Sequence, residues 1–344
     1  MTICKKHIRI VSFFLMLLLA AACNSVSVIS LNVKAPARVV FPKRVDNVVI
    51  VNNAGIQPKD EGHAVYSNKT EEKVSISVDS LSTLMCRHLW ENIAEQNFFS
   101  EVNFYNVPMR ENDEYLSVSP LSVLKINDIA EQTGAEAVIS LDYFYVKSFL
   151  SINRIRDYGI FEAVYEIDTQ MQPTIYVPGE TRKSIALVDT LFWTAYGISP
   201  DDAVARLPYF NDAVFTAIAR AGEIAAKALI PHKQTEERKC YSSFSGDMKK
   251  AMKAVNENEW DKALDIWISV YEKSNNLSIR ARCATNIALA YEIRDDYDRA
   301  EEWAVQAQKE FVSSGSESES HYLKFYVKRL KQRKIESALL DMQE

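Results

Sequence analysis

Glycine is scarce in this chain of 344 residues, with nine in total. The loops that hold the phosphates of nucleotides are built on closely spaced glycines, because the backbone must approach the phosphate with its N–H groups pointing inward. The sequence contains no such loop, and it contains neither His-Glu-x-x-His nor Gly-x-Ser-x-Gly. We therefore predict no cofactor, no metal site and no catalytic residue from the established motifs.

Basic residues are outnumbered as well, with 40 Lys and Arg against 46 Asp and Glu and a formal net charge of -6 at pH 7. A surface that binds nucleic acid needs clustered Lys and Arg to displace the counterions of the phosphates. The acidic balance argues against a nucleic-acid partner. Apolar residues make up 47% of the chain, which is ordinary for a globular protein, and the length favours two domains.

Cysteine occurs five times. Cys86, Cys240 and Cys283 lie in the body of the chain, far apart and without the paired spacing of a zinc site. In an oxidising compartment two of the three could form a disulfide, and their spacing does not indicate which two. We favour three buried free thiols.

The first 22 residues have the organisation of an export signal. Lys5, Lys6 and Arg9 form a basic head, and an uncharged apolar run follows over residues 10–22. The run is shorter than the roughly 20 apolar residues that span a membrane. A basic head, a short apolar stretch and small residues at its end predict a signal peptide over residues 1–22.

Cys23 follows directly after three alanines, Ala20, Ala21 and Ala22. This arrangement resembles the lipobox of bacterial lipoproteins, in which a diacylglyceryl group is attached to the cysteine before cleavage. Ala20 departs from the motif, which usually has leucine there, and a secretory signal with a coincidental cysteine is the alternative. The resemblance implies a lipid on Cys23, each buried CH₂ contributing ~0.8 kcal/mol to anchoring. It therefore implies an outer-membrane lipoprotein, attached to the membrane through this lipid and facing the periplasm.

Residues 23–43 are polar and contain Pro36 and Pro42, which is typical of a tether. After residue 43, short apolar runs alternate with amphipathic segments. Strands are predicted at 48–51, 102–105 and 137–146, and helices begin at Asp79 or Ser80 and at Ser119-Pro120, the second ending at Gly134. The run 137–146 is apolar on both faces and predicts a central strand.

The pattern changes after residue 160. Apolar and charged side chains alternate over residues 161–171, which predicts a half-solvated strand that Pro173 ends. Residues 184–193 supply the return strand of an antiparallel hairpin. Helical structure follows from Ser199 to Pro231. Residues 44–232 therefore predict a small mixed-sheet α/β module.

This order of strands and helices resembles the small α/β module of TolB-type and curli-secretion-type periplasmic proteins, notably at the junction over residues 133–139. The opening over residues 35–53, together with residues 286–288, is similar to a family of uncharacterised bacterial lipoproteins with a domain of unknown function. That resemblance covers nearly the whole chain and implies no activity.

The carboxy-terminal part contains an internal repeat. Residues 233–245 are charged and predict a linker, and beyond them residues 256–263 align with residues 293–300 at a spacing of 37. Repetition of this period indicates stacked helix pairs. The second copy resembles a tetratricopeptide repeat at these positions: Ala284, Asn286, Ile287, Ala288, Ala290, Tyr291, Tyr297, Ala300 and Ala307. Ala288 departs from the repeat, which usually has glycine there. The overall prediction is an α+β protein whose residues 246–344 form an all-α helical repeat domain.

Two repeats bury too little surface to stand alone. A further helix with an aromatic and apolar stripe is predicted to cap them, through Tyr322, Phe325, Tyr326 and Leu330. This helix is basic, and a solvated face is favoured over a membrane or partner patch for the following residues: Lys324, Lys328, Arg329, Lys331, Arg333 and Lys334.

The concave face of the repeat is the predicted groove for a protein or peptide partner. Four residues of one helix are expected to line it: Arg282, Thr285, Leu289 and Glu292.

Three further patterns match catalytic groups in residue type. Ser122 and Lys125 have the Ser-x-x-Lys spacing of penicillin-binding enzymes but lack the companion motifs, so a chance match is favoured. His88 lies on the apolar face of its helix, where a core histidine is more common than a catalytic base.

The third pattern is a row of carboxylates, Glu162, Glu166 and Asp168, on one face of a predicted strand. Two carboxylates held together can perform acid–base chemistry. The solvent-facing side of a sheet is the more common explanation.

The leading hypothesis is a non-catalytic, lipid-anchored protein of the cell envelope that binds another envelope protein or peptide. One alternative is a periplasmic hydrolase that uses the strand carboxylates. Another is an oligomeric secretion-pore subunit whose 160–195 hairpin enters the membrane. The oligomeric state is not predicted by the sequence.

Overall fold

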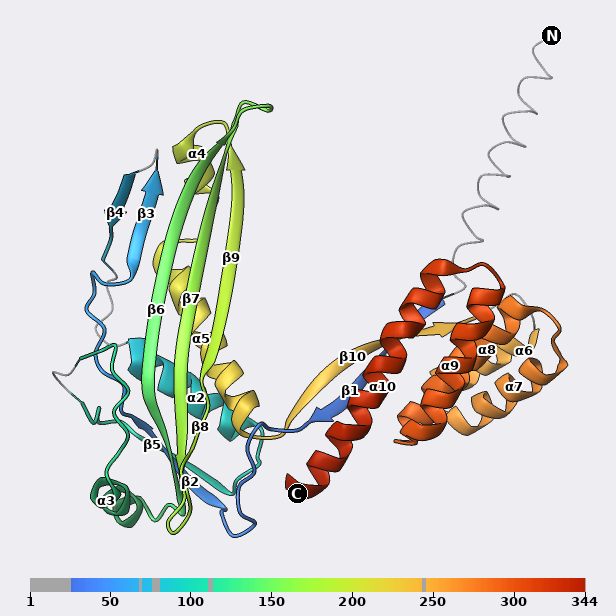
Figure 1. The fold of residues 1–344 in the computed structure, drawn as a ribbon, viewed down its shortest axis with the longest axis horizontal. Coiled ribbons are helices and arrows are strands. Elements are labelled where there is room, and N and C mark those ends of the chain that lie inside the picture. The colour runs from blue at the N-terminus through green and yellow to red at the C-terminus, as the bar shows by residue number, and fades with distance from the viewer. Residues whose placement is uncertain (1–25, 68–69, 76–80, 111–113, 243–245, 344) are drawn as a thin grey trace. The chain divides into compact units, whose positions relative to one another are not determined.

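The computed structural model describes residues 26–67, 70–75, 81–110, 114–242 and 246–343, and it divides the chain into two compact units (Figure 1). Residues 37–232 form the sheet unit, and the described residues up to Pro36 together with Lys233–Met342 form the helical unit. A sheet-rich part followed by an all-helical part confirms the predicted α+β class. Within the described residues, no helix is both long and apolar enough to cross a membrane.

The sheet unit is built around three parallel strands. β2 (Asn47–Asn52) lies between β5 (Glu101–Tyr105) and β6 (Ala137–Ile155). The side chains of Val48, Val49, Ile50 and Val51 are all fully buried. A strand in this position is covered on both faces, which is why its sequence is a continuous apolar run.

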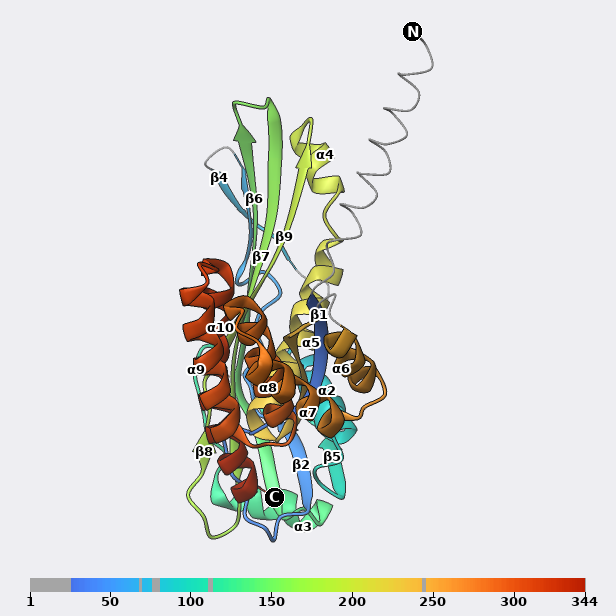
Figure 2. The same ribbon diagram turned by 90° about the vertical axis from the view of Figure 1, so that its right-hand side faces the viewer.

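Helices cover both faces of these three strands. α2 (Leu81–Glu95) and α5 (Phe210–Leu229) pack on one face, and α3 (Val123–Thr133) packs on the other. α2 and α5 contact each other closely at Gly222, where an added Cβ would lie 2.6 Å from the Cβ of His88. Figure 2 shows α5 and the short α4 (Pro200–Ala205) on one side of the long strands.

Beyond the parallel strands the sheet continues with a different set of neighbours. β6 pairs along its whole length with β7 (Ile160–Tyr176), which pairs in turn with β9 (Leu187–Gly197) and briefly with β8 (Lys183–Ser184). On its other edge, the far half of β6 pairs with β3 (His63–Ser67), and β3 pairs with β4 (Thr70–Lys73). In this half the strand order is therefore β9-β7-β6-β3-β4.

A gap separates β2 and β3 along the edge of β6, and the side chain of Gln57 fills it. Its Oε1 accepts a hydrogen bond from the backbone N–H of Val146 at 2.9 Å, and its Nε2 donates to the carbonyl of Val146 at 2.8 Å. One amide side chain thus replaces one residue of a missing strand. This satisfies buried backbone groups that would otherwise be costly.

Three details of the sheet unit differ from the sequence predictions. β3 and β4 lie in a stretch that showed no apolar run, and α3 begins after Ser122 instead of at Ser119-Pro120. β7 continues through Pro173 to Tyr176. Pro173 is tolerated because it lies opposite Leu141, where the register between β6 and β7 shifts, and its missing N–H breaks no regular ladder there.

The helical unit contains two helical hairpins and a long final helix among its described residues. The helices are α6 (Gly246–Asn256), α7 (Trp260–Lys273), α8 (Leu277–Ile293), α9 (Tyr297–Ser313) and α10 (Glu317–Gln343). Asn258 and Asp295, in the turns of the two hairpins, both have positive φ, at 59° and 57°. They lie 37 positions apart, the spacing of the sequence repeat.

Two segments that were predicted to be irregular form strands of this unit. β1 (Val26–Ala35) lies in the predicted tether, β10 (His232–Tyr241) covers most of the predicted linker, and the two pair as a ribbon. Ile29 and Leu31 of β1 pack against the helical core, while the end of β10 is buried in it. The sequence of β10 was misleading because its inward residues before Cys240 are polar or charged instead of apolar.

The gap in the sheet leads to a prediction about Gln57. Replacing Gln57 with Ala leaves the N–H and C=O of a buried residue without partners, and should lower the free energy of unfolding by about 1–3 kcal/mol. Urea denaturation of the parent and the variant measures the change. The control is Gln170→Ala on an exposed position of β7, which should stay within about 0.5 kcal/mol of the parent. Equal stability of Gln57→Ala and parent would show that the amide does not hold this edge.

Candidate functional site

The predicted peptide groove of the helical unit is filled by the chain itself. Thr285 and Leu289 are 0% exposed and Glu292 is 4% exposed, while Arg282 is partly exposed. The side chain of Asn286, on the same helix, bonds to both backbone groups of Tyr241 in β10, with each N···O distance 2.7 Å. Three of the four predicted contact residues are therefore buried in the helical unit, and this face is not an open groove.

An ion-pair network accounts for the burial of Glu292. Arg238 of β10 donates to both carboxylate oxygens of Glu292, from Nε at 2.9 Å and Nη2 at 2.7 Å, and Tyr326 donates to the same carboxylate at 2.7 Å. The network continues through Glu236, which pairs with Arg238 and Arg329. Such a bidentate pair fixes the register of β10 against the helices. The alternation of Glu236, Arg238 and Cys240 at every second position was the feature of the sequence that could have predicted a strand here.

The basic face of α10 is only partly solvated. Arg329 pairs with Glu236 and Glu336, and Arg333 is 5% exposed, donating to the carbonyl of Lys34 at 2.9 Å. Lys331 and Lys334, by contrast, make exposed ion pairs. The predicted stripe is also corrected, because Phe325 is exposed and Leu323 is buried in its place.

The two catalytic patterns on helices have structural roles. Ser122 is the N-cap of α3, and its Oγ accepts a hydrogen bond from the backbone N–H of Lys125 at 3.3 Å. The spacing of Ser-x-x-Lys is thus that of a helix cap. His88 is partly buried between α2 and α5, with its Nδ1 3.0 Å from a carboxylate oxygen of Glu91.

The described cysteines are free and buried. Burial raises the pKa of Cys86 above its usual range and that of Cys240 and Cys283 to about 12. Because the thiolate is the reactive species, these thiols are inert at neutral pH. Within the described ranges, no group of His, Cys, Asp and Glu side chains could hold a metal ion. Cys23 and the signal peptide lie outside the described residues.

Glu162, Glu166 and Asp168 lie together on one face of β7, as predicted. On β9, directly opposite, stand Tyr196, Phe192 and Thr190. Asp168 accepts a hydrogen bond from Thr190 at 2.6 Å, and a hydrogen bond with Glu162 raises the pKa of Tyr196. Two of the three carboxylates are thus engaged with hydroxyl groups of the neighbouring strand.

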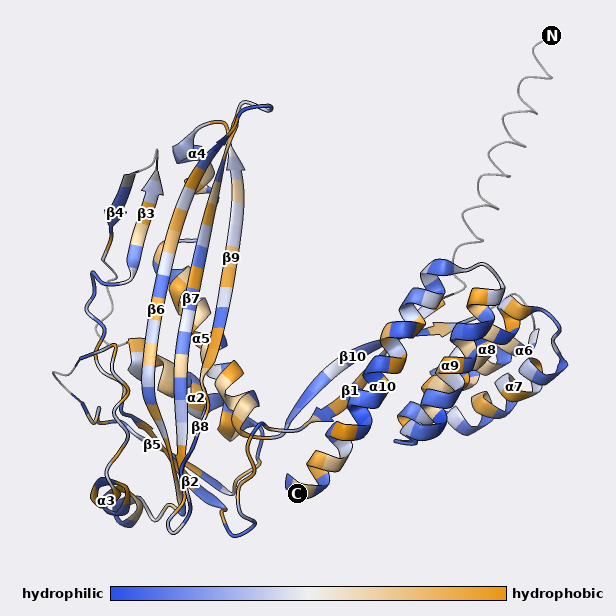
Figure 3. Cartoon of the chain, viewed as in Figure 1, coloured by the Kyte–Doolittle hydropathy of each residue, from blue (hydrophilic) through white to orange (hydrophobic). Residues whose placement is uncertain are grey.

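These carboxylates belong to a sheet surface that we name the open face. It is the side of the β9-β7-β6-β3-β4 half that lies opposite α4 and α5, and Figure 3 shows the alternation of polar and apolar residues along its long strands. The open face consists of alternate residues of the strands, including Tyr66, Tyr145, Lys147, Phe149, Glu162, Glu166, Asp168, Val188, Thr190, Phe192, Thr194 and Tyr196. Val188, Phe192 and Tyr196 are 67%, 59% and 50% exposed. Exposed aromatic and apolar side chains gathered on one surface are typical of a binding site.

Aromatic rings are paired across this face. Tyr66 and Phe149 lie 5.8 Å apart between centroids, and Tyr115 stacks on Tyr145 at 6.1 Å where the open face meets the loop before α3. These contacts pack the rings of each pair against each other. The open face thus combines paired aromatic rings with several carboxylates and few basic groups.

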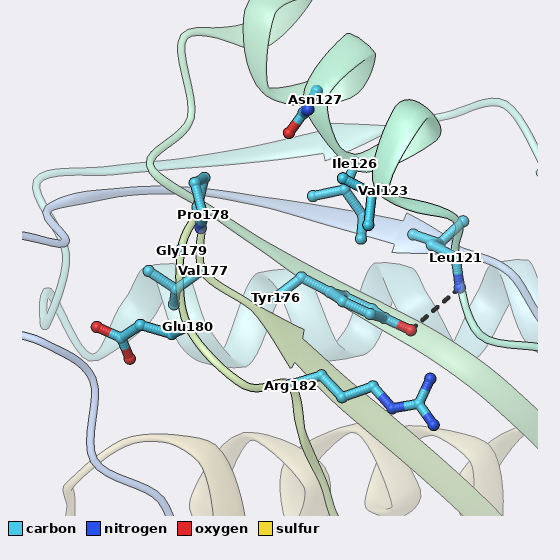
Figure 4. Close-up of a pocket in the computed structure, with 10 residues that line it drawn as sticks. All are labelled: Leu121, Val123, Ile126, Asn127, Tyr176, Val177, Pro178, Gly179, Glu180 and Arg182. Atoms are coloured by element: carbon cyan, nitrogen blue, oxygen red, sulfur yellow. Dashed lines mark hydrogen bonds between the residues drawn. The ribbon is translucent and has the colours of Figure 1, made fainter.

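A cavity of about 430 Å³ lies elsewhere, between α3 and the end of β7 (Figure 4). Its walls are mainly apolar, with Leu121, Ile126 and Tyr176 among them, and Glu180 and Arg182 are its charged lining residues. The residues that line it include no His, Cys or Ser. The cavity can take a small apolar group, but its lining offers no nucleophile with a base.

Behind the cavity is a buried carboxylate, Asp142, which lies within β6 just beyond the residues that pair with the carboxyl end of β2. It accepts hydrogen bonds from Ser140 at 2.6 Å and from Asn53 and Tyr176 at 2.9 Å each. α2 and α3 lie on opposite faces here, so this is the switch point where open α/β sheets commonly bind ligands. The loop before α3 covers it, with Asn53 donating to the carbonyl of Ser119 at 2.7 Å.

Family comparisons agree with a chain of two parts. Residues 45–241 match the family described as Domain of unknown function (DUF8603), which is more than half of the chain. The chain belongs to the DUF8603 family. Residues 249–332 match a second family, described as Domain of unknown function (DUF6340). A comparison with curated proteins finds no match.

The end of the DUF8603 match does not coincide with the end of the sheet unit. The match extends to Tyr241, the last residue of β10, which is a strand of the helical unit. The DUF6340 match then covers α6 to most of α10. In this DUF8603 protein the first family region therefore supplies a strand that the second region buries.

The network around Glu236 leads to a prediction about acid stability. Burial would raise the pKa of Glu236, but hydrogen bonds and charges from Arg329 and Arg238 outweigh it and lower the pKa to about 2. This carboxylate therefore stabilises the helical unit above about pH 4.5, its ordinary value, and that contribution is lost as the pH falls towards 2. Glu236→Gln should lower stability at pH 7 by about 1–3 kcal/mol and flatten the acid limb.

Denaturant unfolding, followed by the helical circular dichroism signal from pH 7 to pH 2, measures this. Glu272→Gln, at an exposed position of α7, is the matched control and should retain the acid limb of the parent. A Glu236→Gln variant whose stability falls as steeply with acid as that of the parent would contradict the assignment.

Proposed function

We propose that this DUF8603 protein is a lipid-anchored protein of the cell envelope that works as a non-catalytic interaction module, and that it binds its partner through the open face. The observation that carries the proposal is the open face itself. It presents exposed aromatic side chains on a rigid sheet, and two of its carboxylates are already bonded to Thr190 and Tyr196.

The chemistry of the open face favours a partner with cationic side chains. In the register of β6 and β7, Lys147 lies opposite Asp168, while Glu162 and Glu166 lie opposite Asn153 and Phe149. The carboxylates thus outnumber the basic group on these strands. Aromatic rings beside carboxylates attract Lys and Arg through both charge and cation–π contacts.

The start of β1 supports anchoring at Cys23. Only Asn24 and Ser25 separate Cys23 from Val26, the first residue of β1. β1 is built into the helical unit, so a lipid on Cys23 would hold that unit at the membrane surface without a long tether. The outer membrane and a periplasm-facing body remain our proposal for its location.

Two further resemblances fit this architecture. Helical hairpins whose turns lie 37 residues apart support a tetratricopeptide-like arrangement. Parallel strands with helices on both faces, followed by antiparallel strands and a long helix, support a likeness to the TolB-type module. The chain's own ribbon fills the face that such repeats use for peptides, which is why we propose the open face as the binding surface.

No specific observation favours either the periplasmic hydrolase or the secretion-pore subunit. A hydrolase would need its carboxylates around a cavity, and Glu162, Glu166 and Asp168 do not line the cavity beside α3. A membrane hairpin would need an apolar lipid-facing side, but the corresponding side of β7 packs on α4 and α5.

The anchor is tested by metabolic labelling with palmitate. The full chain should incorporate label and fractionate with the envelope, and Cys23→Ala should lose both because the acylated thiol is gone. A Cys240→Ala variant, which removes a buried thiol, should label like the parent. Unlabelled parent protein in the cytosol would contradict the proposed location.

The open face is tested by photo-cross-linking in intact envelopes. A photo-reactive residue at Lys147 of the open face should give a discrete adduct, and the same residue at the exposed Lys227 of α5 should not. Adding Glu166→Lys should reduce the Lys147 adduct at least about tenfold by reversing the charge. Equal adducts from both positions, or no effect of Glu166→Lys, would argue against this face.

A further inference from the structure

β9 is a long sheet edge without the usual protection. Its eleven residues pair with β7 on one side, and along its other side the described residues show no strand or backbone partner. Figure 1 shows β9 at the margin of the sheet. The sequence of β9 contains no proline, no lysine and no arginine, and Asp189 is its only charged residue. A free row of N–H and C=O groups on such a strand is a template for another strand.

The other edges of the same sheet are protected. β4 has four residues, of which Glu71, Glu72 and Lys73 are charged, and short charged strands resist edge pairing. On β5, the indole of Trp90 donates to the carbonyl of Val102 at 2.8 Å and stacks on Phe104. Unlike β4 and β5, β9 therefore has an edge whose backbone groups are open to pairing with another strand.

We infer that β9 pairs with β9 of a second copy of this chain, antiparallel and around a two-fold axis at Phe192. Full overlap of residues 187–197 sets this register, because Phe192 is the middle residue. Val188 then lies opposite Tyr196 of the second copy, and Phe192 lies opposite its own equivalent. Thr190 lies opposite Thr194. All of these residues are on the open face, so aromatic and β-branched side chains meet across the junction.

Self-pairing is also compatible with the charges of the strand. In the full-overlap register Asp189 lies opposite Ala195 of the second copy. The two copies of Asp189 are then six residues apart along the pair, about 20 Å, which is beyond the screening length of about 10 Å at 0.1 M salt. Within each copy, Asp189 is bound by Arg220 of α5 at 2.7 Å. No like charges meet, and a partner strand of opposite charge is not required.

The consequence is a continuous sheet that runs through two copies. A two-fold contact of this kind is closed and uses the same surface on both molecules. The open faces of the two copies would become neighbours on one side of the joined sheet. The backbone hydrogen bonds of the contact use the strand edge, while Val188, Phe192 and Tyr196 belong both to the contact and to the open face.

Cysteine cross-linking of the full chain in detergent tests the register. Phe192→Cys places two thiols about 5 Å apart between Cβ atoms across the axis, within reach of a disulfide after small shifts, so mild oxidation should give a dimer that reducing agent dissolves. Val188→Cys is the matched control, at a more exposed position of the same strand. Its two copies would be about 27 Å apart and should remain uncross-linked. The parent chain controls for its own cysteines.

A charge pair tests the contact without any cross-link. Thr190→Lys with Thr194→Lys sets lysines opposite lysines and should weaken the dimer at least about tenfold by light scattering. Thr190→Lys with Thr194→Glu sets each lysine opposite a glutamate of the second copy and should restore it. Circular dichroism and thermal unfolding at low concentration check that both variants fold.

A monomeric parent chain, a Phe192→Cys variant that does not cross-link, or equal cross-linking from Val188→Cys would overturn the inference. So would a double-lysine variant that dimerises like the parent.

Discussion

Strand β6 sets the plan of the sheet unit, because every backbone N–H and C=O along its 19 residues needs a hydrogen-bond partner. One strand pairs along one edge of β6, but no single strand pairs along the whole of the other edge. β7 runs along one edge for its whole length, while β2, the side chain of Gln57 and β3 follow one another along the other. This requirement creates a sheet with a covered half and an uncovered half. α3 covers the first half, and the open face is what remains of the second.

A related rule applies to the charged side chains buried in the helical unit, because a buried charge also needs a partner. The ribbon of β1 and β10 occupies the surface of α8, and an apolar strand could have done so through the hydrophobic effect alone. β10 instead carries Glu236 and Arg238, which pair with each other. Glu236 also pairs with Arg329 of α10, and Arg238 pairs with Glu292 of α8. Replacing both members of such a pair with apolar residues changes the net stability little, whereas breaking the pair leaves an unpaired buried charge and so penalises every wrong register. The network is therefore a specificity device for docking the ribbon.

The two units differ in which surface they leave exposed. In the helical unit, the face of α8 that resembles a repeat's peptide groove is covered by the ribbon of β1 and β10, and β1 starts three residues after Cys23. The sheet unit keeps its aromatic side chains exposed on a rigid support. The strands hold the backbone of these residues in place, so binding there does not require the backbone to become ordered. This division is the basis of the proposal that one unit carries the anchor and the other carries the binding surface.

The sequence by itself determined the local elements whose cause is local. A continuous apolar run specified β2, Gly134 marked the end of α3, and the repeat spacing placed the helical hairpins of an α+β chain. The start of α3 was predicted three residues too early, at Ser119-Pro120. Only the tertiary structure decided that Thr285, Leu289 and Glu292 are buried and that the supposed linker is β10. The reason is physical. The periodicity of apolar side chains in a sequence indicates burial against apolar neighbours. It cannot indicate a strand such as β10, which ion pairs hold in place, or an edge strand such as β9, because both depend on residues far away in the sequence.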